Sequence, residues 1–223
     1  MFSTKKFLSS LAKGRYKRVL YYPSAGERDG GFVCDFDTDI IILSDFRPKT
    51  IRDRRTFWRQ FRQGAAPHEI RLIAATRISR VFRINRRKIG IFLFKENNEA
   101  ITMIRNSGLK INTFFSKNDG CCEGGNLECC NELPFFSKIL NLMPDDGGMY
   151  VISDHNTFLF TGSYHGNTMK DRDFRFVIGN TAYETSLISH REGRMPEFII
   201  KKKCQVNEVK RYDPVSSPTV RGQ

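Results

Sequence analysis

The chain has 223 residues, of which 39% are hydrophobic and 27% are charged, and its formal net charge at pH 7 is +13. A chain of this length can bury one substantial core, and this composition is typical of a globular protein rather than a disordered, collagenous or membrane-embedded one. No apolar run approaches the roughly 20 residues that a membrane-spanning helix needs, and the first residues lack the apolar core of a secretory signal. We therefore expect a cytoplasmic protein with no transmembrane segment.

Both ends of the chain are expected to lie outside the folded domain. Residues 1–18 contain six Lys or Arg and no acidic residue, which is the pattern of a basic arm and also of an organelle transit peptide. The segment after residue 204 is polar, as is typical of a mobile tail. The sequence therefore predicts a basic N-terminal arm over 1–17, a single domain over 18–204 and a mobile polar tail over 205–223.

The first candidate site lies at the beginning of the predicted domain. An apolar run breaks into Pro23-Ser-Ala-Gly26, and a second apolar run ends at Asp45. A nucleotide-binding α/β sheet opens in this way, because glycine lets the backbone approach a ligand and an acid ending the second strand accepts hydrogen bonds from ribose hydroxyls. We expect a ligand above Gly26, with Ser24 and Asp45 beside it. Two buried strands joined by a glycine turn would give the same pattern.

Three acidic residues precede the second apolar run, in Asp35-Phe-Asp-Thr-Asp39. On an extended strand Asp35, Asp37 and Asp39 would share one face, and three carboxylates that close together can bind a hard cation such as Mg²⁺. Such a site would suit a metal-dependent phosphoryl-transfer enzyme, which Asp37→Asn should inactivate. A solvated turn would account for the same acids, and the sequence leaves both interpretations open.

Positive charge is concentrated between Arg47 and Lys88, where fourteen Lys or Arg stand against two acidic residues. Clustered arginines with interleaved aromatic residues are typical of a surface that binds nucleic acid or another polyanion, although a solvated basic face has the same composition. The candidate contacts are Arg52, Arg55, Arg59, Arg62, Arg80, Arg83, Arg86, Arg87 and Lys88.

A helix and three strands are predicted within and just after this basic segment. The helix covers 50–63, because Thr50 and Asp53 have the spacing of a capping pair, and Trp58 is expected as a core anchor on its apolar face. The residues expected on the same face as Trp58 are Ile51 and Phe61. The strands are expected over 69–79, 80–85 and 88–95, with a hairpin turn at 85–87.

Helices and strands then alternate regularly, which implies right-handed crossovers and a parallel sheet covered on both faces. The expected strands cover 89–94, 111–116 and 149–153, and the expected helices cover 98–106 and 134–142. Later strands are expected over 157–161, 174–178 and 198–202, the last of them antiparallel at an edge. The predicted fold is therefore three-layer α/β with a mostly parallel sheet, a basic helix-plus-hairpin insertion over 47–88 and an antiparallel C-terminal edge.

Two further groups of residues were considered for chemistry. Four thiols fall in Cys121-Cys122 and Cys129-Cys130. Thiolates suit zinc, but the spacer is longer than in the usual Cys-x2-4-Cys site, so we predict no metal there. We interpret these cysteines instead as small buried residues that flank a ligand loop. The pair Asp154-His155 follows a predicted strand at the carboxyl edge of the sheet, where an acid and a base can act on a ligand. A structural histidine is the alternative interpretation.

Several of these features occur together in a known family. A glycine-containing turn after the first strand, an acid ending the second, a fourth strand leading to Gly124-Gly125-Asn126 and a fifth ending at Asp154 resemble the Rossmann-like S-adenosylmethionine-dependent methyltransferases. The family's first turn carries an acid-x-Gly-x-Gly-x-Gly signature, where this chain has Pro23-Ser-Ala-Gly26. The resemblance implies S-adenosylmethionine as cofactor, with Gly26 close to it and Asp45 holding its ribose. It also implies that Asp119, Asp154 and His155 lie near the methyl acceptor.

These patterns lead to one functional hypothesis and two alternatives. The first is a methyltransferase-like protein that binds S-adenosylmethionine or a related nucleotide and acts on nucleic acid or another polyanion. The second is a noncatalytic module of the same fold that binds nucleic acid or a nucleotide. The weakest is the metal-dependent phosphoryl-transfer enzyme. The sequence gives no indication of the oligomeric state.

Overall fold

The structure, a computed structural model, describes residues 2–14, 16–116, 133–144, 148–153, 174–178, 181–189 and 197–205. Within these ranges the strands are β1 (Val19–Pro23), β2 (Ile40–Ser44), β3 (Ile70–Ala75), β4 (Ser79–Ile84), β5 (Lys88–Leu93), β6 (Thr113–Ser116), β7 (Met149–Ser153), β8 (Phe174–Ile178), β9 (Thr181–Ser189) and β10 (Glu197–Gln205). The helices are α1 (Thr4–Ala12), α2 (Gly30–Asp35), α3 (Ile51–Gly64), α4 (Asn97–Ser107) and α5 (Leu133–Leu140). None of these helices is long and apolar enough to cross a membrane.

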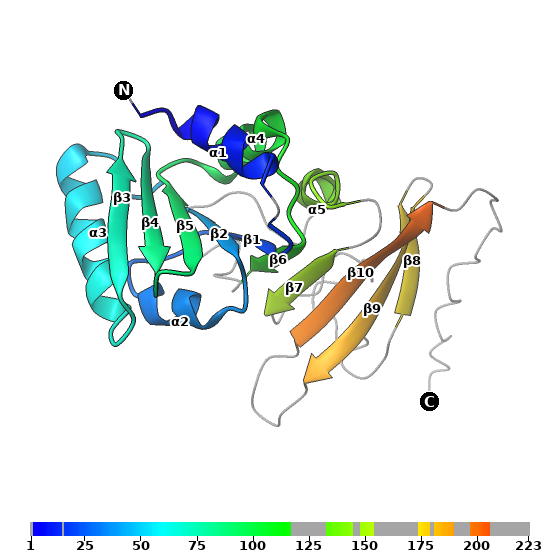
Figure 1. The fold of residues 1–223 in the computed structure, drawn as a ribbon. Helices are drawn as coiled ribbons and strands as arrows, with labels where there is room; N and C mark the ends of the chain where they lie inside the picture. Colours follow the sequence, from blue (N-terminus) through cyan, green and yellow to red (C-terminus); the bar gives the residue numbers. More distant parts are fainter. Residues whose placement is uncertain are drawn as a thin grey trace, which may run out of the picture.

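The strands form one sheet in the order β3-β4-β5-β2-β1-β6-β7-β10-β9-β8 (Figure 1). Its centre, from β5 to β7, is parallel at every junction. Every residue of β1 and β2 is buried, as expected for strands that are rich in β-branched and aromatic residues and covered on both faces. The predicted α/β fold with a parallel centre is therefore confirmed.

Helices cover both faces of this parallel centre and complete three layers. Along β1, Val19 and Tyr21 pack into a core cluster with residues of α1, α4 and α5. The alternate residues Leu20 and Tyr22 pack into a second cluster with residues of α2 and α3. Because successive side chains of a strand point to opposite faces, the two clusters place α1, α4 and α5 on one face and α2 and α3 on the other (Figure 1).

Antiparallel strands extend the sheet on both sides. On one side of the sheet β4 pairs with β5, and β3 pairs with β4 at the edge. Along the chain, α3, β3 and β4 come between the central strands β2 and β5, as predicted for the insertion. On the other side β10 pairs with β7 and with β9, so this strand is antiparallel as predicted but lies inside the sheet, and β8 forms the edge. Strand β9 was not predicted, and the strand expected over 157–161 lies outside the described residues.

Helix α3 begins as its capping pair predicts. The Thr50 hydroxyl accepts the Asp53 N–H at 3.1 Å, and the Asp53 carboxylate accepts the Thr50 N–H at 3.0 Å. Trp58 is buried against Phe82, with ring centroids 5.0 Å apart, so its predicted role as a core anchor is confirmed. Ile51, predicted on the same face, is 58% exposed, because the buried contacts of the helix come from its middle and last turns.

Helix α1 occupies most of the segment that the sequence analysis treated as a basic arm. Ser3 caps the helix through its side chain, and Leu8 is fully buried in the same cluster as Ile101 and Ile104 of α4. Lys5 lies on the exposed side. Leu8 and Leu11, which lie one turn apart and are both buried, therefore hold this basic segment against the core.

We expect Leu8→Ala to lower the free energy of unfolding by about 2–5 kcal/mol, because it leaves a cavity between α1 and α4. Urea unfolding followed by circular dichroism would measure the change. Lys5→Ala on the exposed side of the same helix is the matched control and should stay within about 0.5 kcal/mol of wild type. Equal effects of the two substitutions would contradict the packing of α1.

Candidate functional site

The turn between β1 and α2 lies where an open parallel sheet usually binds its ligand. Such ligands lie outside the carboxyl ends of the strands, at the point where the strand order reverses. Here β1 has β2 on one side and β6 on the other, so the chain turns in opposite directions from β1. Residues 24–29, directly after β1, occupy this position.

A buried carboxylate holds this turn. Asp29 accepts the Gly26 N–H at 2.7 Å and the Tyr22 hydroxyl at 2.9 Å through the same oxygen. Ser24 has the left-handed φ of 55°, and the Ala25 N–H donates to the Ser44 carbonyl at 3.1 Å, which ties the turn to the end of β2. Asp29 was not among the site residues predicted from the sequence, although its position three residues after Gly26 is typical of a side chain that closes a turn.

Gly26 and Gly30 differ in how closely the rest of the protein approaches them. A Cβ at Gly26 would lie 3.4 Å from Asp29 Oδ2 and 3.5 Å from Arg47 Nη2, which are ordinary contacts. A Cβ at Gly30 would lie 2.0 Å from the Phe61 carbonyl oxygen, so α2 and α3 can approach this closely only with glycine there. The tightest backbone approach is therefore between two helices and not at the turn itself.

Asp45 follows β2 next to this turn, and Arg47 donates hydrogen bonds to both oxygens of its carboxylate. The side chain of Asp45 is 2% exposed. Its Oδ1 accepts the Arg47 backbone N–H at 2.9 Å and Nε at 3.2 Å, and its Oδ2 accepts Nε at 2.9 Å and Nη2 at 2.7 Å. Burial raises the pKa of Asp45 above its ordinary value, and the bonds from Arg47 oppose that rise.

Asn97 brings an unsatisfied polar group to the same edge of the sheet. It is the first residue of α4, follows β5 closely and is 3% exposed. Its Oδ1 accepts the Ser44 hydroxyl at 3.2 Å, and Nδ2 has no hydrogen-bond partner among the described residues. Reversing the amide would leave the oxygen unpaired instead. A buried amide with one unpaired atom is costly unless a ligand or water satisfies it, and only its place after a central strand could have signalled it in the sequence.

The residues predicted near a methyl acceptor, Asp119, Asp154 and His155, lie outside the described residues. The same holds for Cys121, Cys122, Cys129 and Cys130. Their proposed roles therefore stay predictions from the sequence.

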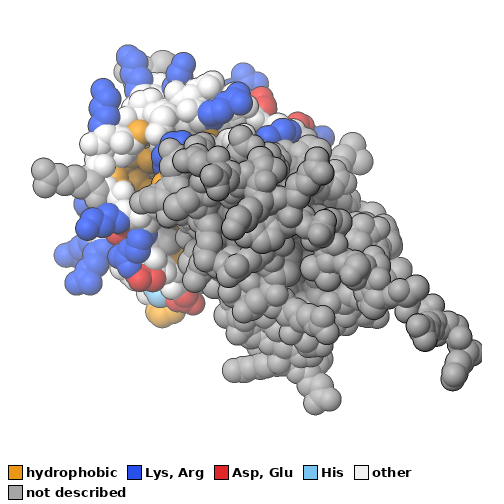
Figure 2. All heavy atoms as spheres, turned by 90° about the vertical axis from the view of Figure 1, so that its right-hand side faces the viewer, with side chains coloured by type: hydrophobic (Ala, Val, Ile, Leu, Met, Phe, Trp, Pro, Cys, Tyr) orange, Lys and Arg blue, Asp and Glu red, His pale blue; other side chains and the backbone are white. Residues whose placement is uncertain are grey.

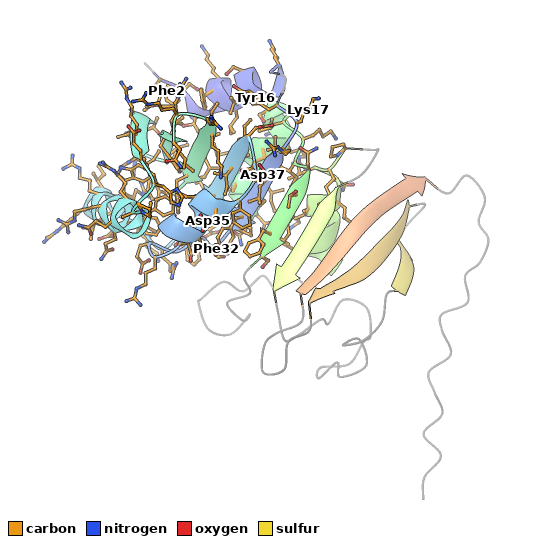
Figure 3. All side chains as sticks on the ribbon, turned by 60° about the horizontal axis from the view of Figure 1, so that its bottom comes forward. Phe2, Tyr16, Lys17, Phe32, Asp35 and Asp37 are labelled. Carbon is orange, nitrogen blue, oxygen red and sulfur yellow. The ribbon has the colours of Figure 1, made fainter. Side chains whose placement is uncertain are left out.

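The three acids considered for a metal are bound by basic and backbone groups, and Asp37 and Asp39 share Arg18. Asp35 lies 3.2 Å from His68, Asp37 pairs with Arg18, and Asp39 accepts the backbone N–H groups of Lys17 and Arg18 at 3.0 Å each. Figure 3 shows Asp35 near Phe32 on α2, and Asp37 between Asp35 and Lys17. Within the part of the chain that the structure describes, no three His, Cys, Asp or Glu residues are grouped to hold a metal ion.

Most of the predicted basic surface is exposed. Arginines project along the side of α3 that faces away from the core, and others surround the turn between β4 and β5. In Figure 2, Lys and Arg side chains project on several sides of the described surface. The predicted contacts that are exposed are Arg52, Arg55, Arg59, Arg62, Arg83, Arg86 and Arg87.

Arg80 and Lys88 are bound within the protein instead. The Arg80 guanidinium donates to the carbonyls of Thr76 at 2.7 Å and Ser79 at 2.9 Å, and it is 8% exposed. The Lys88 ammonium donates to the carbonyls of Cys34 and Phe36 at the end of α2. Neither charge is therefore placed to meet a phosphate. The sequence could not show this, because the imperfect alternation of the strand does not reveal which basic side chains turn inward.

A shallow groove of about 280 Å³ lies between Arg47 and α3. Arg47 and Pro48 form one side of it. The residues of α3 that line it are Arg52, Asp53, Thr56, Phe57 and Gln60. Arg47, which bonds to Asp45, therefore also lines a groove beside the basic helix.

The parallel centre with helices on both faces, and the strand order that reverses at β1, form a Rossmann-like α/β fold. The chain is similar to Trm1 from Pyrococcus horikoshii in complex with S-adenosyl-L-methionine, with a TM-score of 0.50 and 12% identity over 92% of this chain. It spans 57% of the length of that protein. It is also similar to an rRNA methylase from Streptococcus thermophilus, with a TM-score of 0.40 and 10% identity over 91% of this chain and 95% of that one. No protein-family model matches the sequence, and no curated protein matches it significantly.

The stability contributions of Asp45 and Asp39 should depend on pH with opposite signs. Burial raises the pKa of Asp45, so its contribution is present at low pH and is lost as the pH rises through that raised pKa. Burial alone would raise the pKa of Asp39, but the bonds from Lys17 and Arg18 outweigh it and lower the value. The contribution of Asp39 is therefore present above its unfolded pKa and is lost as the pH falls.

We therefore expect the stability of Asp45→Asn relative to wild type to rise between about pH 3 and about pH 7, and that of Asp39→Asn to fall. Denaturant unfolding across this range would measure both differences. The two variants remove the same charge and serve as controls for each other. Slopes of the same sign would contradict the environment described for Asp45.

Proposed function

We propose that the protein binds S-adenosylmethionine at the carboxyl edge of β1, β2 and β5 and acts as a methyltransferase-like protein on nucleic acid. The observation that carries the proposal is the buried carboxylate of Asp45, which ends β2 beside the Gly26 turn at the point where the strand order reverses. Carboxylates at this position of Rossmann-like sheets accept hydrogen bonds from ribose hydroxyls.

The residues of this edge fit an adenosyl group. Once Arg47 has moved from it, Asp45 would offer acceptors for ribose hydroxyls, and the turn at Gly26 would offer backbone that a ligand can approach. The unsatisfied amide of Asn97 matches a purine base, whose edge carries hydrogen-bond donors and acceptors. Bound S-adenosylmethionine would supply an activated methyl group on its sulfonium. Ser24, beside Gly26, is proposed to contact the cofactor, and Asp119, Asp154 and His155 are proposed to lie near the acceptor.

The proposed acceptor is nucleic acid because the exposed positive charge lies next to this edge. Four exposed arginines, at positions 52, 55, 59 and 62, recur along α3. The first of them, Arg52, lines the same groove as Arg47, whose guanidinium bonds to Asp45. A phosphate backbone along α3 would therefore bring a nucleotide toward the cofactor edge.

A noncatalytic nucleic-acid or nucleotide-binding module is the second candidate, and one observation favours it. Arg47 occupies both oxygens of Asp45, so the carboxylate is bound within the protein in this structure. The metal-dependent phosphoryl-transfer hypothesis gains no support from the described residues, where Asp35, Asp37 and Asp39 are not grouped to hold a metal ion and Arg18 pairs with both Asp37 and Asp39.

S-adenosylhomocysteine, held at about a hundred times its dissociation constant, should stabilise the protein by about 2.7 kcal/mol. Asp45→Ala should abolish this effect, and Asn97→Ala should weaken binding about 5- to 30-fold because it removes a buried hydrogen bond. Thermal unfolding and calorimetric titration would measure both changes. Arg105→Ala, an exposed position on α4, is the control and should bind like wild type. Absence of any stabilisation of wild type would overturn the cofactor proposal and favour the noncatalytic module.

Replacing Arg52, Arg55, Arg59 and Arg62 by Gln should weaken binding of a single-stranded oligonucleotide. The slope of log affinity against log salt should become shallower by about 3, because about 0.7 counterion is released per phosphate contact on a single strand. Fluorescence anisotropy at several salt concentrations would measure the slope.

A control variant with the same net charge distinguishes binding of the oligonucleotide at α3 from its attraction by the net positive charge of the protein. It replaces Lys5, Lys6, Lys13 and Arg105, which are exposed on α1 and α4 and at the end of α1, by Gln. This variant should keep the wild-type slope. Equal losses in the two variants would mean that net charge alone, and not the surface of α3, attracts the oligonucleotide.

A further inference from the structure

Arg47 lies at the junction of the two regions that the proposed function uses. On one side its guanidinium bonds to Asp45, and its Nη2 lies 3.5 Å from the position of a Cβ on Gly26. On the other side it lines the groove that continues beside Arg52 on α3. Its side chain is 48% exposed, so part of it is open to the groove.

In this arrangement Asp45 has no acceptor left for a ribose. A carboxylate offers about four lone-pair positions, and the contacts from the Arg47 backbone N–H, Nε and Nη2 use two on each oxygen. The side chain of Asp45 is also 2% exposed, so no face of it is open to solvent. Ribose hydroxyls can therefore bond to Asp45 only after the Arg47 guanidinium has moved.

Neither the departure of Arg47 from Asp45 nor the arrival of a ribose at Asp45 is favourable alone. If Arg47 leaves without a ribose, the buried carboxylate of Asp45 loses its cation, which is costly in a dry environment. If a ribose arrives first, the guanidinium must give up a bidentate pair without a new anion. A phosphodiester resolves the second difficulty, because its two oxygens match the planar fork of an arginine. The ribose resolves the first, because its hydroxyls donate to the carboxylate.

The groove has the chemistry that a phosphate needs. Arg52, Thr56 and Gln60 line it together with Arg47 and can donate hydrogen bonds to phosphate oxygens. Asp53 is the acid in its lining, and its carboxylate accepts the Thr50 N–H in the capping box of α3. The groove is shallow, which suits a backbone phosphate lying on the surface rather than an enclosed small molecule.

We propose that this groove is a phosphate subsite for nucleic acid, and that Arg47 exchanges between Asp45 and a backbone phosphate so that nucleic acid and the adenosyl cofactor strengthen each other's binding. The inference rests on the proposed function, because it assigns the ribose to Asp45. The coupling is reciprocal by linkage. It gives Arg47, which sequence analysis did not select, the role of a positioning residue between the two ligands.

The test measures the affinity of S-adenosylhomocysteine with and without a saturating single-stranded oligonucleotide of about ten nucleotides. In wild type the oligonucleotide should tighten S-adenosylhomocysteine binding about tenfold, within the usual range for coupled sites, and the reverse titration should show the same factor. In Arg47→Ala the cofactor analogue should bind without the oligonucleotide about as tightly as it binds wild type with it. The effect of the oligonucleotide should then fall below about twofold.

Two variants sharpen this test. Arg47→Lys keeps the charge but loses the planar fork, so it should retain oligonucleotide binding with reduced coupling. Arg105→Ala removes one exposed charge from the other face of the sheet and should show wild-type coupling. Far-UV circular dichroism of each variant checks that it folds, and the wild-type measurement stands without any variant.

The possible results separate the two proposals. Equal coupling in wild type and Arg47→Ala would overturn the role of Arg47 while leaving the cofactor site intact. Tight binding of S-adenosylhomocysteine to wild type with no effect of the oligonucleotide would do the same. Absence of S-adenosylhomocysteine binding in both proteins, with and without the oligonucleotide, would overturn the proposed function itself.

Discussion

The complete burial of β1 and β2 is the constraint on which the rest of the structure depends. Because no position of these strands faces solvent, hydrogen-bonding side chains can serve a ligand only where the strands end. The carboxyl ends of β1, β2 and β5 accordingly gather Asp29, Asp45 and Asn97 within a few residues of an apolar core. The helices that seal the strands on both faces also fix the directions from which a ligand can approach.

The distribution of charge follows from the same arrangement. Acidic groups at the sheet edge are partly buried and are held by hydroxyl, amide and guanidinium donors. Basic groups are carried by α3 and by the turn between β4 and β5, outside the parallel centre, where most of them are exposed. Long basic side chains keep their charges in water while their stems cover apolar surface. The protein thus separates a polar, buried edge from a positive, solvated flank, with Arg47 at the boundary.

Features set by neighbouring residues could be read from the sequence, and features set by distant ones could not. The strand at Met149–Ser153, the capping of α3 and the end of α4 at Gly108, which has φ 76°, follow from local apolar runs and capping residues. The interior place of β10 depends on its pairing with β7, which lies far from it in the chain. The guanidinium of Arg80 bonds to the nearby carbonyls of Thr76 and Ser79, but its inward direction could not be predicted from residue spacing. Asp45 could be selected as a strand-ending acid, but its capture by Arg47 depends on a side-chain direction that spacing does not reveal.

The contact between α2 and α3 bears on how this fold varies among related chains. Since a Cβ at Gly30 would lie 2.0 Å from a carbonyl oxygen of α3, any other residue there would force the two helices apart. Gly26, which makes no such contact, can be replaced without crowding its neighbours. Related chains should therefore keep glycine at position 30 whether or not they bind a ligand, whereas glycine at position 26 is needed only where a ligand approaches its backbone.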